Sequence, residues 1–194
     1  VGIQCHIGDS EQREGLIAKT IEQFGRIDIL VNNAAINPYY GPLEGSDEAV
    51  FDKIMNVNVK APWILSNLVL PHMKKKGGGS IINISSVEGI TPGFGLGLYS
   101  ATKSALIMLT KNQAKEWGRH GIRANVLCPG LIKTKFSEGL WSNDQLVEGF
   151  TKAPLGRIAA PEEMAGMVML LASEAGSYMT GGVYVADGGY LISG

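Results

Sequence analysis

The sequence contains few cysteines, no long apolar run and no excess of either charge. Only Cys5 and Cys128 occur among 194 residues, both in apolar segments, so we expect reduced thiols in place of a disulfide framework. No apolar run approaches the roughly 18–20 residues that cross a bilayer. The formal charge of −1 gives no basic surface for nucleic acid. We therefore expect a cytoplasmic protein that binds neither nucleic acid nor membrane.

Strand-like and helix-like segments alternate along the chain. Runs rich in isoleucine and valine are typical of parallel strands covered on both faces, and segments of helical period separate them. This order predicts an α/β protein with a doubly wound parallel sheet, in a single domain over residues 1–194. The expected strands are 27–35, 80–87, 122–128 and 183–186, with 2–7 as a further candidate, and the expected helices are 10–25, 46–76, 99–119 and 161–173.

The ends of the helix expected at 46–76 carry recognisable signals. Ser46 is a candidate N-terminal cap, with acidic residues behind it. The triple lysine at 74–76 precedes three of the chain's 26 glycines, which is ordinary helix termination. An anion-binding patch is the alternative interpretation of these lysines.

Small and polar residues follow three of the predicted strands. Ligands of open α/β sheets bind beyond the carboxyl ends of the strands, so these positions predict the site. The segments concerned are 33–35, 85–86 and 129–130.

Tyr99 and Lys103 are four residues apart, which places both side chains on one face of a helix. A nearby ammonium favours the phenolate and would lower the tyrosine pKa from about 10. A tyrosine tuned in this way, beside a serine hydroxyl, could exchange a proton with a carbonyl or alcohol oxygen. Such pairs are also common on exposed helices, and the spacing alone indicates little.

Asn58 is a polar residue on an otherwise apolar helical stripe. Pro62 has no N–H to bond the carbonyl of Asn58, so a kink with a free acceptor is expected there. A helix bend satisfied by structural water is the alternative.

Taken together, these residues resemble the short-chain dehydrogenase/reductase family. The resemblance rests on Asn33-Ala34-Ala35, Asn58, Ser86, Tyr99-x-x-x-Lys103 and Pro129-Gly130 in this order, and it extends over essentially the whole chain. It implies a Rossmann-like sheet and NAD(P)-dependent interconversion of a carbonyl (ketone or aldehyde) and an alcohol. Residues 37–43 and 128–141 most resemble the branch with NADPH-dependent retinol dehydrogenase/carbonyl reductases and tropinone-reductase-like enzymes, which favours NADP(H) over NAD(H).

The family's roles transfer to matching positions. Tyr99 would be the general acid or base, and Ser86 would orient the substrate oxygen. Lys103 would lower the tyrosine pKa and bind the nicotinamide ribose, while the Asn58 carbonyl would hold a relay water. The resemblance implies that the cofactor is bound by Asn33, Ala34, Tyr99, Lys103, Pro129, Gly130, Ile132 and Thr134.

The substrate is expected to be a small hydrophobic carbonyl or alcohol. Apolar side chains in a lid at about 135–155, and in one further loop, would contact it: Phe94, Phe136, Leu140 and Trp141. No metal site is expected. The family also implies a homotetramer, or a homodimer, built on the long central helices.

The sequence departs from the family pattern at its N-terminal end. The family's glycine-rich phosphate turn is absent, and Val1 aligns near the family's third strand. We therefore expect an N-terminally incomplete domain that lacks the first two strands and their helices. His6 stands where the family often has an aspartate near adenine, and a solvated surface histidine is an equal alternative.

Two rival functions are compatible with the same residues. One is a non-catalytic nucleotide-binding or assembly module on the same scaffold, which includes the case of an inactive fragment. The other is an epimerase or dehydratase that uses the same tyrosine and lysine.

Overall fold

The computed structural model describes residues 1–193, apart from the side chains of 144–146, and contains one four-stranded parallel sheet. Its strands are β1 (Ile29–Asn32), β2 (Gly79–Ile84), β3 (Ile122–Pro129) and β4 (Val183–Ala186), in the spatial order β1-β2-β3-β4. The two central strands, β2 and β3, bury most of their side chains, as strands covered on both faces do. The predicted α/β class with a doubly wound, Rossmann-like parallel sheet is confirmed.

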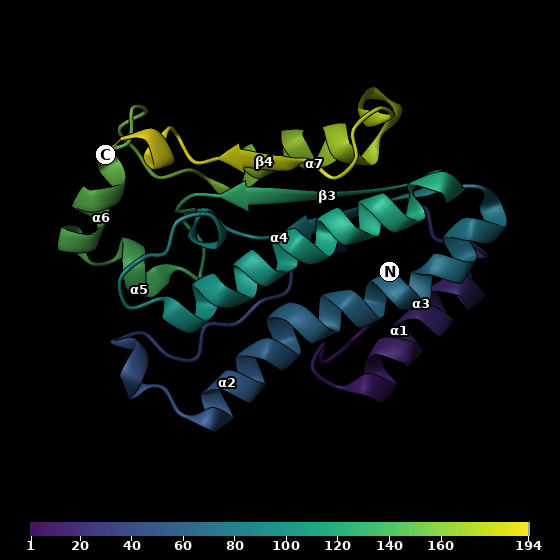
Figure 1. Ribbon diagram of the computed structural model, residues 1–194, viewed down its shortest axis with the longest axis horizontal. Helices are drawn as coiled ribbons and strands as arrows, with labels where there is room; N and C mark the ends of the chain where they lie inside the picture. The colour runs from purple at the N-terminus through teal and green to yellow at the C-terminus, as the bar shows by residue number, and fades with distance from the viewer. Residues whose placement is uncertain (194) are drawn as a thin grey trace.

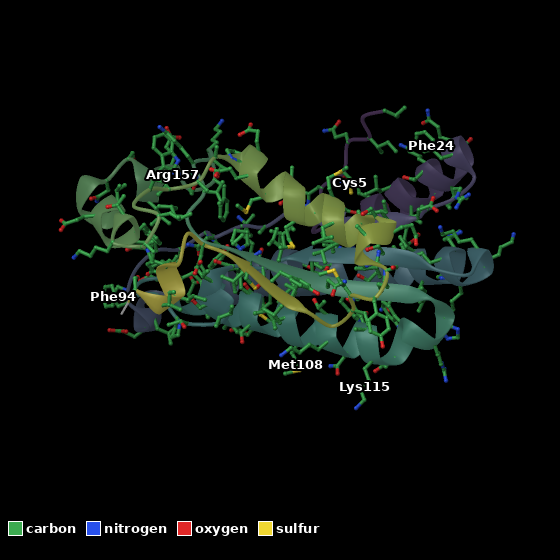
Figure 2. All side chains as sticks on the ribbon, turned by 90° about the horizontal axis from the view of Figure 1, so that it is seen from above. Cys5, Phe24, Phe94, Met108, Lys115 and Arg157 are labelled. Atoms are coloured by element: carbon green, nitrogen blue, oxygen red, sulfur yellow. The ribbon has the colours of Figure 1, made fainter. Side chains whose placement is uncertain are left out.

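Helices cover both faces of the sheet. The helices are α1 (Ser10–Phe24), α2 (Glu48–Met55), α3 (Ala61–Lys76), α4 (Gly97–Trp117), α5 (Glu138–Trp141), α6 (Asp144–Thr151) and α7 (Ala165–Ala172). Helices α3 and α4 pack against one face, with α1 beside α3, and α7 contacts β2 and β3 from the other side (Figure 2). In Figure 1 the arrows of β3 and β4 point toward α5 and α6, so these short helices lie at the carboxyl end of the sheet.

The helix predicted for residues 46–76 is distorted at the point that Pro62 indicates. A π-helical turn at Asn56–Lys60 separates α2 from α3, and the N–H of Ala61 bonds the carbonyl of Asn56, five residues back. Proline at the second position of α3 removes the next N–H, so the regular ladder cannot continue across this point. A turn of this kind often marks a functional site.

The ends of this helical segment agree only in part with the sequence prediction. The N-terminal cap is Asp47, whose carboxylate accepts from the N–H of Val50 at 2.8 Å, and the predicted cap Ser46 instead donates to the carbonyl of Leu43. At the other end the three lysines occupy the last turn, and Gly77 closes it with φ of 86°. The left-handed conformation is one that glycine adopts without steric cost.

The prediction of a strand at residues 2–7 is wrong. No residue of this segment pairs with the sheet, whose edge strand β1 pairs only with β2 in the described part of the chain. A strand needs a hydrogen-bonded neighbour, and a pattern of side chains cannot supply one. The helix predicted at 161–173 begins as a 3-10 turn at Pro161–Met164 and becomes α-helical only in α7.

A buried polar network crosses the apolar interior. The side-chain amide of Asn32 on β1 donates to Asn83 on β2 at 2.7 Å, and Asn83 donates to Thr110 on α4 at 2.8 Å. All three side chains are buried. Buried polar groups are stable only when they are paired, so this chain of bonds fixes how β1, β2 and α4 sit together.

Candidate active site

The carboxyl ends of the strands border a cavity of about 840 Å³. Its walls are the segment after β1, the end of β2, the first turn of α4 and the loops after β3. This is the place where open α/β sheets bind their ligands. The predicted site residues that line it are Asn33, Ala34, Ser86, Tyr99, Lys103, Pro129, Gly130, Ile132, Thr134, Phe136 and Leu140.

Ser86 lies just beyond β2 and is 9% exposed. Its hydroxyl accepts a hydrogen bond from the N–H of Glu88 at 3.2 Å. The turn that follows packs tightly on α4, since a Cβ at Gly89 would lie 2.7 Å from the carbonyl carbon of Lys103. Glycine at 89 therefore permits the approach that brings the serine beside the first turn of α4.

Tyr99 lies in the first turn of α4, beside Ser86. Burial raises the pKa of Tyr99 to about 12, and a hydrogen bond with the Ser86 hydroxyl offsets part of that increase. The charge of Glu88 raises this pKa further. The ring of Phe136 lies 6.2 Å from the tyrosine ring, centroid to centroid. At neutral pH Tyr99 is therefore protonated and can act as an acid.

Lys103 is one turn further along α4 and is 3% exposed. Its Nζ donates to the carbonyl of Ile84 at 2.8 Å and lies 5.5 Å from the centroid of the Tyr99 ring. Burial lowers the pKa of Lys103 to about 8. The sequence interpretation gave Lys103 the task of lowering the tyrosine pKa; in this arrangement burial outweighs any such effect, and the pKa of Tyr99 is raised.

Asn58 lies in the π-helical turn, behind the cavity wall, and does not line the cavity. Its amide joins the segment after β1 to α4: Oδ1 accepts from the N–H of Ile36 at 2.9 Å, and Nδ2 donates to the Ile36 carbonyl at 2.9 Å and to Thr102 at 3.1 Å. The hydroxyl of Thr102 donates in turn to the carbonyl of Tyr99 at 2.7 Å. The side chain of Asn58 thus supports the turn that carries the tyrosine.

The predicted substrate residues divide into two pairs. Phe136 and Leu140 line the cavity. Trp141 does not line it: its indole N–H donates to the carbonyl of Thr134 at 2.7 Å, and the Nζ of Lys133 lies 5.1 Å from the ring centroid. Phe94 also lies outside it, is 87% exposed, and is at the outer edge of the molecule in Figure 2. This arrangement gives neither Phe94 nor Trp141 a place in the cavity wall.

Sequence reasoning missed one titratable residue of the cavity. Glu88, two positions beyond Ser86, lines it and is 8% exposed. A carboxylate directly after the buried end of a strand was the available signal, because charged residues are rarely buried without a partner or a function.

Other classes of site are not found in the described part of the chain. No group of three or more histidine, cysteine, aspartate or glutamate side chains there could hold a metal ion. Cys5 and Cys128 are free thiols, as predicted, and His6 is exposed. None of the described helices is both long and apolar enough to span a membrane.

Known proteins resemble this chain over nearly its full length. The family model described as enoyl-(acyl carrier protein) reductase matches residues 1–191. The rabbit (Oryctolagus cuniculus) protein named dehydrogenase/reductase SDR family member 4 is 46% identical over 189 residues, which is 97% of this chain and 73% of that protein. The human protein of the same name is 43% identical over 97% of this chain and 68% of its own length.

A solved structure shows the same fold. A gluconate 5-dehydrogenase from Burkholderia cenocepacia, crystallised with NADP and tartrate, superposes with a TM-score of 0.92 at 33% identity, over 96% of this chain and 73% of that one. The match includes the parallel sheet whose carboxyl ends border the cavity. The chain therefore belongs to the short-chain dehydrogenase/reductase family of oxidoreductases.

Proposed function

We propose that the protein interconverts a carbonyl and an alcohol with a nicotinamide cofactor, and that Tyr99 exchanges the proton. One observation carries the proposal: Ser86, Tyr99 and Lys103 open onto one cavity at the carboxyl ends of the strands. A hydroxyl pair of this kind, set beside a buried amine, can bind a substrate oxygen and protonate it.

The cavity has a wall that suits a nicotinamide nucleotide. Small residues and exposed backbone line it after β1 and after β3, where a flat ring can approach closely: Asn33, Ala34, Pro129, Gly130, Ile132 and Thr134. A bound nicotinamide would supply or accept the hydride, while the protein would position it and handle the proton. We propose NADP(H) over NAD(H), because the similar gluconate 5-dehydrogenase was crystallised with NADP.

The proton chemistry follows from the burial of Tyr99 and Lys103. With a pKa near 12, the Tyr99 phenol keeps its proton at neutral pH, which is the form needed to protonate a carbonyl oxygen. The Ser86 hydroxyl would hold that oxygen in place. Lys103, with a pKa near 8, can carry a proton at neutral pH, and we propose that it also binds the nicotinamide ribose. Near neutrality Tyr99 is therefore in the protonated form that reduction requires.

We further propose that the main-chain carbonyl of Asn58 holds a water that relays a proton toward Lys103. The π-helical turn supports this role, because an irregular helix with Pro62 at its end has carbonyls outside the regular ladder.

The substrate proposed is a small hydrophobic ketone or aldehyde, or the matching alcohol. Apolar side chains support it, since Phe136, Leu140 and Phe150 line the same cavity as Ser86. A homotetramer or homodimer is also proposed. Trp63 on α3 and Met108 on α4 support it, because both are large apolar side chains that remain about half exposed.

The test uses the full-length protein expressed from its native gene. Its melting temperature is followed in NADPH and then in NADH, because a ligand that binds only the folded state raises it. Cofactor oxidation is then measured with a series of apolar ketones. The proposal expects a larger thermal shift with NADPH and one cofactor oxidised for each ketone reduced.

The rival functions give different results in the same test. A nucleotide-binding or assembly module would show the thermal shift without oxidation of NADPH by any ketone in the series. An epimerase or dehydratase would convert its substrate without net consumption of cofactor. Either result contradicts the proposed function.

A further inference from the structure

Glu88 is a buried acid that the proposed proton chemistry leaves without a task. Its side chain is 8% exposed and lines the cavity beside Ser86. Burying a carboxylate is costly unless hydrogen bonds compensate it. Burial raises the pKa of Glu88, while bonds from Gly93 and Ser100 hold part of that increase back. The bonds that offset this cost tie the carboxylate to neighbouring segments of the chain.

Its partners come from the loop at 91–96 and from the helix that follows it. The backbone N–H of Gly93 donates to the carboxylate, and the hydroxyl of Ser100, on the first turn of α4, donates to Oε2 at 3.4 Å. The contact with Gly93 is close, since a Cβ at that position would overlap both carboxylate oxygens. The loop formed by residues 91–96 therefore rests directly on Glu88.

This loop holds a second part of the cavity wall. Leu96 lines the cavity, and the carbonyl of Gly95 accepts from the N–H of Gly41 at 3.0 Å. The ring of Tyr40, which also lines the cavity, packs against Gly95: a Cβ there would lie 3.0 Å from the ring. A change at Glu88 would thus reach both the 91–96 loop and the segment around Tyr40.

We propose that Glu88 is a positioning residue, whose buried carboxylate anchors the 91–96 loop to α4 and so shapes the part of the cavity wall formed by Leu96 and Tyr40, where the substrate would bind. The inference rests on the proposed function for its kinetic readout. It concerns substrate binding more than turnover, because Ser86 is held by the backbone N–H of Glu88 and this bond survives any side-chain substitution.

The carboxylate also acts at a distance through its charge. It lies close enough to disfavour the ionised forms of Tyr99 and of Tyr190, which follows β4, and it shares the cavity with the Lys103 amine. A neutral side chain of the same shape would keep the anchor and remove this charge. Substitution can therefore separate the hydrogen-bonding role of the Glu88 side chain from the effect of its charge.

The anchor is tested by a double-mutant cycle of Glu88→Ala and Gly93→Ala in the full-length protein. Each single substitution should raise KM for a ketone about tenfold, with kcat changed by less than about threefold, because each breaks the contact that orders the loop. In the double variant the Glu88 carboxylate is absent, so the methyl group introduced by Gly93→Ala no longer overlaps it. The double variant should therefore also show about a tenfold increase, and not the hundredfold of independent sites.

A second readout does not depend on activity. Hydrogen exchange of the amides at 91–96 should be about tenfold faster in Glu88→Ala and in Gly93→Ala than in the native protein. In Glu88→Gln the exchange should stay native, because an amide oxygen still accepts from Gly93. The exposed residue Glu116, on the far end of α4, supplies the control substitution Glu116→Gln, which should change none of these quantities.

The charge is tested by Glu88→Gln alone. Removing a negative neighbour favours the phenolate, so alcohol oxidation should rise at a lower pH than in the native protein, with an unchanged KM.

Additive KM effects in the double-mutant cycle, or native hydrogen exchange at 91–96 in Glu88→Ala, would contradict the anchoring role of Glu88. Failure of the proposed function looks different, since the native protein would then oxidise no cofactor while the exchange results could still hold.

Discussion

The cavity has two walls that the protein builds in different ways. The wall formed by β2 and α4 is buried, and backbone or buried side-chain contacts fix Ser86 and Lys103. The opposite wall is formed by residues between 131 and 164, in loops and short helices, and includes exposed side chains: Phe136, for example, is 56% exposed. Proton transfer requires a fixed geometry, whereas substrate selection requires a surface that loops can vary.

The lid wall is held by polar contacts near solvent. The Trp141 indole donates to the Thr134 carbonyl, and the two terminal guanidinium nitrogens of Arg157 donate to the carboxylate of Glu163, at 2.7 and 2.8 Å. Exposed ion pairs contribute little to stability because water screens them. The comparison therefore predicts that substitutions of Ser86, Tyr99 and Lys103, or of the Asn58 side chain that supports their helix, affect turnover or folding, while those in the wall at 131–164 affect substrate binding.

The largest effect is expected from Tyr99→Phe. Removing the hydroxyl removes the proposed proton donor, so turnover should fall by roughly 10²–10⁴, the usual contribution of a positioned general acid. Cofactor binding should stay near native, as a fluorescence titration with NADPH would measure. Tyr178→Phe is the matched control, since Tyr178 is fully exposed. Unchanged turnover in Tyr99→Phe would remove the tyrosine from the chemistry.

The pH dependence of reduction separates Lys103 from Tyr99. Reduction needs the phenol, which persists until a pKa near 12, and the proposed relay needs the ammonium, which loses its proton near pH 8. The rate should therefore be flat below about pH 8 and fall above it. In Lys103→Arg the guanidinium stays charged, so the fall near pH 8 should disappear although the rate is lower. If the rate of the Lys103→Arg variant still falls near pH 8, the fall reflects the titration of another group.

Asn58→Ala should destabilise the protein. The substitution leaves the partly buried N–H and carbonyl of Ile36 without their side-chain partner and removes the bond that the Thr102 hydroxyl accepts, although this hydroxyl still donates to the Tyr99 carbonyl. Unpaired buried groups cost about 1–3 kcal/mol each, so the melting temperature should fall by several degrees. Arg157→Ala, which breaks the exposed ion pair with Glu163 in the wall at 131–164, should lower it less. The reverse order, measured by calorimetry, would contradict the difference drawn between the two walls.

Leu140→Ala should act on substrate binding alone. The side chain lines the cavity, and its loss should raise KM for an apolar ketone about tenfold, with little change in kcat. The comparison fails if kcat falls as far as it does in Tyr99→Phe.

The smallest effect is expected at Phe94. Because its ring is 87% exposed and outside the cavity, Phe94→Ala should change kcat, KM and stability by no more than about twofold. A tenfold rise in KM would show that this ring contacts the substrate after all.

The sequence predicted the buried wall better than the lid. Near-continuous apolar strands and the four-residue spacing of Tyr99 and Lys103 depend on local periodicity, which survives folding. Pro62 likewise indicated the helix distortion, because a missing N–H acts locally. The directions of Phe94 and Trp141 depend on which loop neighbours they meet, and no periodicity encodes that. The strand at 2–7 was mispredicted for a related reason, since pairing needs a partner from elsewhere in the fold.

The most direct test of the central claim is a crystal structure of the full-length protein with NADP and a ketone or alcohol bound. The account predicts that the substrate oxygen lies about 2.6–3.2 Å from both the Tyr99 and the Ser86 hydroxyl oxygens, with the carbon chain against Phe136 and Leu140. A substrate oxygen bound in the same cavity but out of reach of Tyr99 would contradict it.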